Sequence, residues 1–185
     1  MGDLKLKKIY DEMSEVYDKN RVPKYHNTLT NYLKESISKK NKILEIGCGT
    51  GGYIIELSKS GYNCKGVDYS EKMIKRALIN VNNANAKCEF KVADVENKVP
   101  FKEKFDTVIS MDSWEFFPNP EKVMENVNKS LKKEGKFIII TPNIFFALPI
   151  IVAEKLKIKK LSPAYTYFNS SKRKINKLSK KTGFK

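Results

Sequence analysis

The chain has 185 residues, enough for one domain with a sizeable core and too few for two full domains of ordinary size. Its net charge of +15 would suit nucleic acid or an anionic membrane, but nearly all of its basic residues are Lys, and Asn and Ile are also abundant, which favours a compositional bias. The basic excess is concentrated after residue 154, where every charged side chain is Lys or Arg, so the tail is a distinct electrostatic region.

The cysteines and the amino-terminal segment indicate a cytoplasmic protein. Cys48, Cys64 and Cys88 are odd in number and lack Cys-x-x-Cys spacing, so neither a disulfide framework, nor a zinc site, nor any other metal site is predicted. Residues 1–20 mix charged residues with isolated apolar ones and hold no apolar block of the kind that a secretory signal needs. We therefore expect the chain to work in a reducing compartment.

The first elements in the chain are expected to be two helices. Residues 9–17 and 25–37 have helical patterns and precede the first strand candidate. We expect both helices to lie over the carboxyl edge of the sheet that follows.

Residues 41–142 alternate short apolar runs with longer amphipathic stretches, which is typical of repeated βαβ units and a parallel sheet. The runs are rich in Ile, Val and Phe, as strands covered on both faces should be. The strands are predicted at 43–46, 64–67, 88–93, 105–110 and 137–141. The sequence thus predicts a doubly wound, Rossmann-like α/β fold with three layers and a mostly parallel sheet.

Two amphipathic helices are predicted between these strands. Ser70 can cap the first, Asn119 followed by Pro120 opens the second, and Gly135 is predicted to end the second. Their buried faces are predicted to consist of Met73, Ile74, Ala77 and Leu78 in the first helix and of Val123, Met124, Val127 and Leu131 in the second.

The region after the fifth strand is apolar and then basic. Residues 144–153 are almost wholly apolar but too few to span a bilayer, and a Lys-rich stretch follows. The segment 144–160 either lies on an anionic membrane surface, where it would deliver a hydrophobic acceptor, or packs beside the sheet. A helix is predicted over 170–181 with Ile175 and Leu178 inward, which gives the division into 1–40, 41–142 and 143–185.

The strongest local signal is the segment 44–52, a strand that runs into a glycine-rich turn and then a helix. Gly47, Gly49 and Gly52 satisfy the dinucleotide pattern G-x-G-x-x-G, and Asp68 follows about twenty residues later at the end of the second strand, as a ribose ligand should. Taken alone, this motif leaves an NAD-dependent oxidoreductase open.

Glu45 favours a different ligand. A carboxylate two residues before the first glycine would repel a pyrophosphate, whereas a ligand that carries an ammonium group would gain from it. The amino-acid end of S-adenosylmethionine is such a ligand. The alternative is a structural carboxylate that accepts hydrogen bonds from backbone amides.

Several motifs together resemble the class I S-adenosylmethionine-dependent methyltransferases, and especially the methyltransferase-11-like branch that includes quinone C-methyltransferases. Their order and spacing agree with that family throughout the predicted sheet. The matching segments are 45–51, 66–70, 93–95, 105–111 and 131–137, with 10–18 similar to the entry helix of the family.

The resemblance implies S-adenosylmethionine as cofactor and a set of residues around it. Asp68 would bind the ribose hydroxyls, Tyr69 and Met73 would flank the adenine, and Tyr17 would close over the cofactor. The full set implied is Tyr17, Glu45, Gly47, Gly49, Gly51, Asp68, Tyr69, Met73, Asp94, Val95 and Met111. Asp94 would accept a hydrogen bond from the adenine amino group, although it is also placed to cap a turn, and Met73 and Tyr17 also suit plain packing.

The reaction implied is an in-line displacement on the sulfonium, which needs a positioned acceptor and no metal. A general base is needed only if the acceptor must lose a proton, and the candidates are Asp112, Glu115 and His26, none of which stands out. His26 is expected to be a surface or packing residue.

Aromatic residues follow the fourth strand, where acceptors usually enter in this fold. Trp114, Phe116 and Phe117 form either an apolar wall for the acceptor or core anchors.

The chain departs from the family at its carboxyl end, where the sixth and seventh strands of other members do not follow. We expect a truncated domain whose fifth strand is an exposed apolar edge. The predicted function is methyl transfer to a small molecule or to a lipid-like or quinone-like acceptor, and the oligomeric state is not predicted.

Three alternatives stay open from the sequence. They are a truncated or degenerate module that binds S-adenosylmethionine without turnover, the oxidoreductase, and a nucleic-acid methyltransferase. The last is disfavoured because residues 112–115 read Asp-Ser-Trp-Glu in place of the Asn/Asp-Pro-Pro-Tyr/Phe pattern of many such enzymes.

Overall fold

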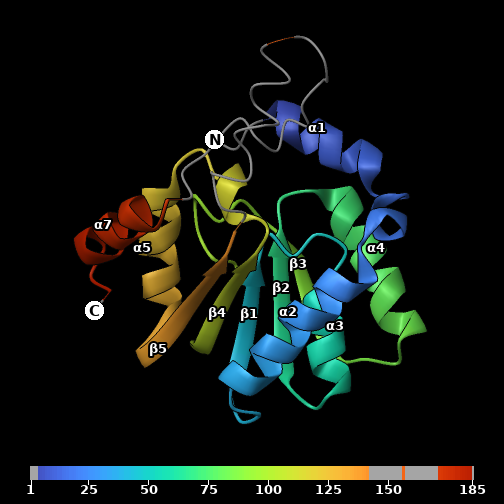
Figure 1. Ribbon diagram of the computed structural model, residues 1–185, viewed down its shortest axis with the longest axis horizontal. Helices are drawn as coiled ribbons and strands as arrows, with labels where there is room; N and C mark the ends of the chain where they lie inside the picture. Colours follow the sequence, from blue (N-terminus) through green and yellow to red (C-terminus); the bar gives the residue numbers. More distant parts are fainter. Residues whose placement is uncertain (1–3, 142–155, 157–170, 185) are drawn as a thin grey trace.

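A computed structural model of the protein describes residues 4–141, 156 and 171–184. In this part of the chain, one sheet carries helices on both faces (Figure 1). The strands are β1 (Lys42–Ile46), β2 (Asn63–Asp68), β3 (Cys88–Val92), β4 (Phe105–Met111) and β5 (Leu131–Ile140). The helices are α1 (Leu4–Met13), α2 (Pro23–Ser36), α3 (Gly52–Lys59), α4 (Glu71–Asn83), α5 (Pro120–Ser130) and α7 (Lys172–Lys181), with 3-10 helices η1 (Tyr17–Asn20) and η2 (Trp114–Phe116).

The five strands are all parallel, in the order β3-β2-β1-β4-β5. Strands β2 and β3 therefore follow on one side of β1, and β4 and β5 follow on its other side. In such a sheet a crevice opens at the carboxyl ends of the strands where the order reverses, here between β1 and β4. The predicted doubly wound α/β fold is confirmed.

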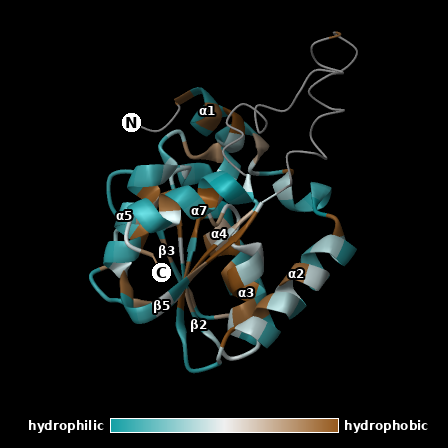
Figure 2. Cartoon of the chain, turned by 60° about the vertical axis from the view of Figure 1, so that its left-hand side comes forward, coloured by the Kyte–Doolittle hydropathy of each residue, from teal (hydrophilic) through white to brown (hydrophobic). Residues whose placement is uncertain are grey.

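Each face of the sheet has its own hydrophobic core. Alternate residues of a strand point to opposite faces, so Ile43 of β1 packs with α2, α3 and α4, and Leu44 packs with α5. Hydrophobic residues gather along the strands between the helices, and hydrophilic residues cover the outer sides of the helices (Figure 2). The three layers predicted from the apolar strands follow from this alternation.

The amino-terminal helix lies earlier in the chain than predicted. The expectation for residues 9–17 was wrong, because α1 spans Leu4–Met13 and a separate 3-10 turn begins at Tyr17. The helix ends where the Ser14 hydroxyl donates to the Asp11 carbonyl at 2.9 Å, a local bond that competes with the helical pattern. Its start includes Leu6, which is buried despite the lysines around it.

The second amphipathic helix ends before Gly135, which corrects another prediction. Helix α5 stops at Ser130, whose hydroxyl donates to the Val127 carbonyl at 2.8 Å, and Leu131 is already extended with ψ of 150°. Leu131 is buried and pairs with Phe105, so β5 begins six residues earlier than predicted, with a register irregularity along the way. Strand β5 is the last of the described sheet, and its residues 137–140 are half-buried.

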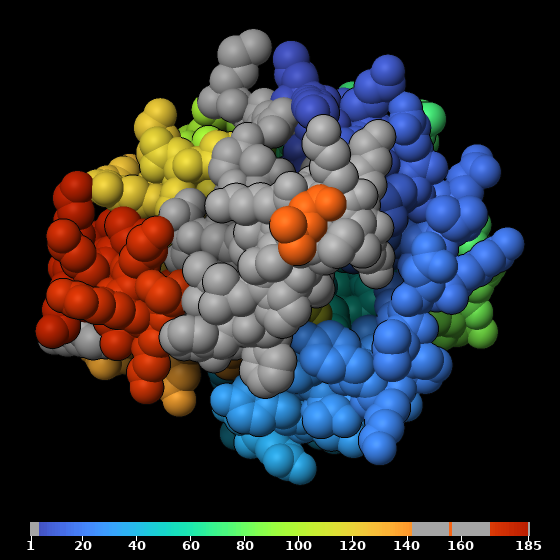
Figure 3. Space-filling model, turned by 45° about the horizontal axis from the view of Figure 1, so that its top comes forward, coloured from blue at the N-terminus to red at the C-terminus, as the bar shows by residue number. Residues whose placement is uncertain are grey.

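Two further predictions about helix faces can be checked. In α4, Met73, Ile74 and Ala77 are buried as predicted, but Leu78 is 46% exposed and Val81 takes the fourth buried position. In α7, Ile175 and Leu178 pack against the core cluster that contains α5, as predicted. Helix α7 and the amino-terminal helices lie on opposite sides of the face seen in Figure 3.

The segment 144–160, predicted to contact a membrane or to pack beside the sheet, lies outside the described residues apart from residue 156. Within the described ranges, no helix combines the length and the apolar character needed to cross a bilayer. The predicted boundary at residues 40 and 41 falls in the loop between α2 and β1.

Candidate functional site

A cavity of about 380 Å³ lies at the carboxyl ends of β1, β2 and β4. Its floor is the glycine-rich turn after β1, and its walls come from the segments after β2, β3 and β4. Residues of α1, η1 and α2 close the remaining side, so these amino-terminal elements do lie over the carboxyl edge of the sheet. The volume is within the range of small-ligand and cofactor sites.

Ten of the eleven predicted cofactor-binding residues line this cavity. The exception is Gly51, which caps α3 with φ of +81° and faces the ring of Phe90, while Gly52 lines the cavity in its place. The ten are Tyr17, Glu45, Gly47, Gly49, Asp68, Tyr69, Met73, Asp94, Val95 and Met111. Their direct contact with a cofactor stays a prediction.

Gly47 is required by both its backbone and its neighbours. Its φ is +64°, and a Cβ atom there would lie 2.6 Å from the Cβ of Ser113. The Ser113 hydroxyl donates to the Ile46 carbonyl at 3.0 Å, which fixes the loop after β4 against the glycine turn. This bond therefore fixes one wall of the cavity rigidly to its floor.

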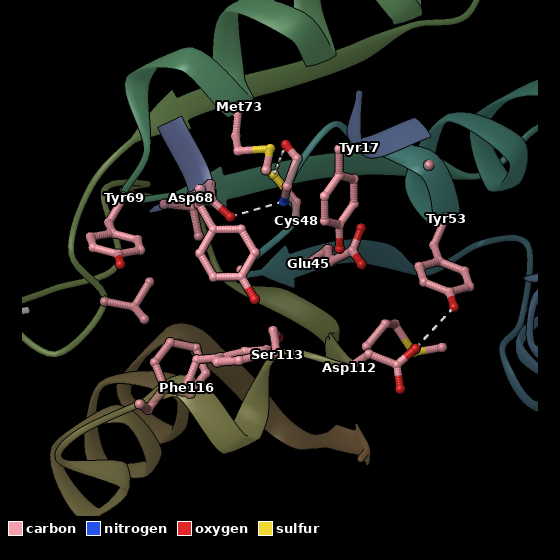
Figure 4. A pocket seen from close by; sticks show the side chains of 18 of the residues that line it. Tyr17, Glu45, Cys48, Tyr53, Asp68, Tyr69, Met73, Asp112, Ser113 and Phe116 are labelled. Carbon is pink, nitrogen blue, oxygen red and sulfur yellow. Dashed lines mark hydrogen bonds between the residues drawn. The ribbon is translucent and has the colours of Figure 1, made fainter. Parts of the chain in front are cut away.

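Asp68 is held at the end of β2 by the backbone. Its two oxygens accept hydrogen bonds from the amides of Gly49 and Ser70, each at 2.9 Å, and the first of these bonds is drawn in Figure 4. Burial raises the pKa of Asp68, and the backbone amides that donate to it oppose this rise. The carboxylate keeps free lone pairs that can accept from hydroxyl groups of a ligand.

Glu45 is the least satisfied acid of the cavity. Its side chain is 1% exposed, and its Oε2 has no hydrogen-bond partner among the described residues. Burial raises the pKa of Glu45 well above its usual range, and the Arg21 guanidinium and a hydrogen bond from the Ile54 backbone act in the opposite direction. The alternative of a carboxylate that accepts from a backbone amide therefore holds for part of this side chain, and Oε2 is left over. A buried carboxyl oxygen without a partner is costly, so this position suits a ligand that donates to it.

The 3-10 helix η1 is tied to the glycine turn through Asp18. The Asp18 carboxylate accepts from the Thr50 hydroxyl at 2.6 Å, from the Asn80 amide at 2.8 Å and from the Arg21 guanidinium at 2.8 Å. The Arg21 guanidinium covers Gly52, where a Cβ would lie 2.4 Å from its nearest atom. Sequence reasoning missed this network.

Asp94 caps a turn, which is one of the two roles predicted for it from the sequence. Its carboxylate accepts from the Glu96 amide at 2.9 Å and from the Asn97 side chain at 3.3 Å. It also lines the cavity together with Val95, so its capping role and the predicted contact with an adenine are compatible.

The three candidate bases occupy different places. Asp112 lines the cavity and accepts from the hydroxyls of Tyr25 at 2.8 Å and Tyr53 at 3.3 Å. Glu115 does not line the cavity; it accepts from the Thr141 hydroxyl at 2.8 Å, and burial raises its pKa to about 7. Asp112 is therefore the only carboxylate of the three candidates with access to a ligand.

His26 was expected at the surface or in plain packing, and the first part of this expectation was wrong. The side chain is 6% exposed, lines the cavity and stacks on the ring of Tyr53 at 4.3 Å. Burial and the nearby Arg21 lower the pKa of His26 to about 4, so the ring is neutral near pH 7.

The aromatic residues after β4 divide between core and cavity. Trp114 is fully buried in the core, which matches its interpretation as an anchor, whereas Phe116 and Phe117 line the cavity. Tyr10 packs edge-on against Phe116 with ring centroids 5.4 Å apart. Together these rings make an apolar wall between the amino-terminal helices and β4.

Comparison with known proteins agrees with the geometry. A sequence profile for a family described as a methyltransferase domain matches residues 37–183. A putative methyltransferase of Bacillus subtilis is 30% identical over 131 residues, an alignment that covers 69% of this chain and 53% of that protein. A ubiquinone biosynthesis O-methyltransferase of Coxiella burnetii is 29% identical over 113 residues, covering 60% of this chain and 48% of that enzyme. The chain spans about half the length of these curated relatives.

Solved structures show the same fold. A protein from Pyrococcus horikoshii superposes with a TM-score of 0.70 and 30% identity, covering 85% of this chain and 79% of the other. A magnesium protoporphyrin IX methyltransferase from Synechocystis, solved with bound S-adenosylhomocysteine, gives a TM-score of 0.67 at 20% identity and covers 86% of this chain and 72% of that one.

Proposed function

Because the chain belongs to the family of class I S-adenosylmethionine-dependent methyltransferases, we propose that it binds S-adenosylmethionine in the cavity at the strand ends and transfers the methyl group to a small, largely apolar acceptor. The observation that carries this proposal is that Glu45 and Asp68 line one cavity.

The two carboxylates suit the two polar ends of this cofactor. Asp68 would accept from the ribose hydroxyls, because its oxygens are already fixed by backbone amides. Oε2 of Glu45, which has no hydrogen-bond partner in the part of the chain that the structure describes, would accept from the ammonium of the methionine part. A dinucleotide would instead place its pyrophosphate near the Glu45 carboxyl, which gives no compensating contact.

The chain's own part in the reaction is to bind, orient and exclude water. The sulfonium supplies an activated methyl group, so no metal is required for the displacement. Met111, Phe116 and Phe117 would keep the reacting atoms in an apolar space. The ubiquinone biosynthesis O-methyltransferase among the relatives supports a lipophilic acceptor.

Calorimetry with S-adenosylmethionine, S-adenosylhomocysteine and NADH tests the cofactor. We expect both sulfur compounds to bind and NADH to bind at least a hundredfold more weakly, and preferred binding of NADH would contradict the proposal. Transfer of a labelled methyl group into a bacterial lipid extract tests turnover. Cofactor binding with no transfer to lipids or to small aromatic molecules would favour a binding module without turnover.

Two finer points stay predictions: a cytoplasmic location and peripheral membrane contact through 144–160. Sedimentation with anionic vesicles tests the second, because an electrostatic contact is weakened by salt. Absence of salt-sensitive cosedimentation would contradict membrane contact.

A further inference from the structure

Four polar side chains gather at one end of the cavity and have no role in the proposed cofactor contacts. They are Tyr25 and His26 of α2, Tyr53 of α3, and Asp112 directly after β4, and we call them the Asp112 cluster. Figure 4 places Asp112 and Asp68 at opposite sides of the site. The cluster is therefore separate from the carboxylate expected to bind the ribose.

The backbone of Asp112 adopts an uncommon conformation. Its φ is +50°, in the left-handed region that residues other than glycine rarely adopt. The conformation is held because the Asp112 amide donates to the Ile140 carbonyl at 2.8 Å and so extends the pairing of β4 with β5. Backbone of this kind often marks a functional position.

Two tyrosines from different helices fix the Asp112 carboxylate. Tyr25 donates to Oδ1 at 2.8 Å and Tyr53 donates to Oδ2 at 3.3 Å. Burial raises the pKa of both phenols, so they remain protonated donors near neutral pH. The carboxylate retains lone pairs that point elsewhere and can accept one more hydrogen bond.

His26 adds a second polar group without adding charge. Its ring lies against Tyr53 with an angle of 21° between the planes, and its Nε2 has no hydrogen-bond partner among the described residues. Because the ring is neutral, it does not repel a sulfonium. A buried, unpartnered nitrogen on a cavity wall is explained when a ligand supplies its partner.

We propose that the Asp112 cluster is the acceptor subsite and that it takes a phenolic hydroxyl, with Asp112 accepting the hydroxyl proton during methyl transfer. This inference rests on the proposed function. Two apolar side chains of the same cavity stand next to members of the cluster in the chain and suit a flat ring, namely Val22 directly before α2 and Met111 directly before Asp112.

Acidity selects a phenol over an aliphatic alcohol. A phenol has a pKa near 10, as tyrosine does, and burial raises the pKa of Asp112, which brings base and acid closer together. An aliphatic alcohol is a far weaker acid and would not give its proton to a carboxylate. In the transfer the O–H bond breaks and the proton moves to Asp112. The acceptor oxygen gains the methyl carbon, and the S–CH₃ electron pair stays on sulfur.

The test uses three probes of similar shape: 1-naphthol, 1-naphthalenemethanol and 1-naphthylmethylamine. Their binding to protein saturated with S-adenosylhomocysteine is followed by calorimetry, and methylated product is measured by mass spectrometry with S-adenosylmethionine. We expect 1-naphthol to bind and to be methylated at least tenfold faster than the other two.

The variants are Asp112→Asn, Tyr25→Phe and Tyr53→Phe, with Tyr32→Phe as the control, because Tyr32 is an exposed tyrosine of the same helix α2. Asp112→Asn should lower kcat/KM for 1-naphthol about a hundredfold, the usual contribution of a general base, and change the Kd of S-adenosylhomocysteine less than twofold. Tyr32→Phe should change neither quantity.

The tyrosine variants test positioning through the pH profile. The groups that face or electrostatically influence Asp112 are Tyr25 on α2, Tyr53 on α3, Glu115 in η2, and Tyr17 and Glu45 across the cavity. The two phenols lower the pKa of Asp112, so each Tyr→Phe change should move the acidic limb of kcat/KM to higher pH. An unmoved limb would overturn their role, and the test stands even where Asp112→Asn does not fold.

The remaining outcomes separate this inference from the proposed function. Failure of the wild-type protein to bind S-adenosylhomocysteine would overturn the proposed function. Normal cofactor binding with no bound 1-naphthol, or full turnover by Asp112→Asn, would overturn the subsite alone. Loss of S-adenosylhomocysteine binding in Asp112→Asn would assign Asp112 to the cofactor, and faster methylation of the amine would overturn the choice of a phenol.

Discussion

The two sides of the cavity are built in different ways. The strand side consists of the glycine turn and Asp68, whose contacts are backbone amides at the ends of β1 and β2. The helical cover consists of α1 and η1, and it is attached by side chains. Asp18 and Arg21 bond to the glycine turn, Asp11 accepts from the Ser70 hydroxyl, and Leu6 and Tyr10 of α1 make apolar contacts. The strand side is thus preformed by the sheet, whereas the cover depends on side-chain contacts, both polar and apolar.

The two sides should therefore control different properties: the affinity for the ligand and the access of the ligand to the cavity. Backbone donors on a sheet lose little freedom when a ligand binds, so the strand side should supply most of the binding energy. A cover held by side chains can open at small cost, so it should control entry and retention of the ligand. Four changes test this division: two on the strand side, one in η2 and one in the cover.

The largest effect is expected on the strand side, from Asp68→Ala. Two charge-assisted hydrogen bonds to ribose hydroxyls would be lost, together about 4 kcal/mol, or about a thousandfold in the Kd of S-adenosylhomocysteine. Calorimetry measures this Kd. Asp106→Ala is the matched control, because Asp106 also accepts a backbone amide but does not line the cavity. Equal losses in the two variants would place the effect in folding and not in ligand contact.

The next effect concerns Glu115 of η2, which interacts electrostatically with Tyr10 of the cover and with Tyr25 of α2. Its pKa is raised by burial from 4.5 to about 7, so the folded state holds the proton more tightly than the unfolded state does. Stability from this group is therefore present at low pH and is lost as pH rises from 4.5 through 7, a change of about 3 kcal/mol. Glu115→Gln should remove this loss.

Urea unfolding at pH 4 and pH 8 measures the loss of stability that Glu115 causes as pH rises. The variant should match the wild type at pH 4 and exceed it by about 3 kcal/mol at pH 8. His26, whose pKa is lowered to about 4, is present in both proteins and cancels in the comparison. Identical stability at pH 8 would mean that the Glu115 carboxylate is solvated in the folded state.

The third change tests the rigidity of the floor. Gly47→Ala places a Cβ 2.6 Å from Ser113 at a φ of +64°, whereas Gly61→Ala meets nothing within 4 Å at a φ of +90°. Both variants carry the backbone cost of about 1 kcal/mol, and only the first adds overpacking of about 2 kcal/mol. Thermal melts should therefore show that Gly47→Ala lowers the free energy of unfolding by about 2 kcal/mol more than Gly61→Ala does. Equal melting temperatures would show that the loop after β4 yields easily and that the floor is not rigid.

The strand side was predictable from the sequence because its information is local. Glu45, Gly47 and Gly49 are nearly contiguous, and Asp68 ends the next strand, whose parallel register with β1 brings the two strand ends together. One exception is Gly51. It matches the motif but caps α3, which begins at Gly52, and it does not line the cavity.

The place of the cover over the strand ends was predicted, but its polar contacts were not, because they are long-range. Asp18 of the cover meets Thr50 from 32 residues away and Asn80 from 62. Outside the cover, Tyr25 of α2 meets Asp112 from 87 residues away. Periodicity indicates which face of a helix is buried, but not which polar side chain it will meet. The end of α1 carries no glycine or proline either, and depends on a single serine hydroxyl.

The smallest expected effect comes from breaking the attachment of the cover, with Asp18→Ala. Thr50, Asn80 and Arg21 would lose their shared acceptor, so η1 would leave the glycine turn more often. The affinity for S-adenosylhomocysteine should fall about tenfold, because the free energy of closing the cover, about 1.4 kcal/mol, is then drawn from binding. Calorimetry measures this change.

Limited proteolysis tells this mechanism apart from a direct ligand contact. If Asp18 acts by holding the cover, cleavage within residues 1–22 should be faster in the variant than in the wild type without ligand, and saturating S-adenosylhomocysteine should restore much of the protection. Glu12→Ala is the control, because it removes an exposed acid of the same segment. Weaker binding with unchanged cleavage would mean that Asp18 contacts the ligand, and the two sides would then differ less than their construction suggests.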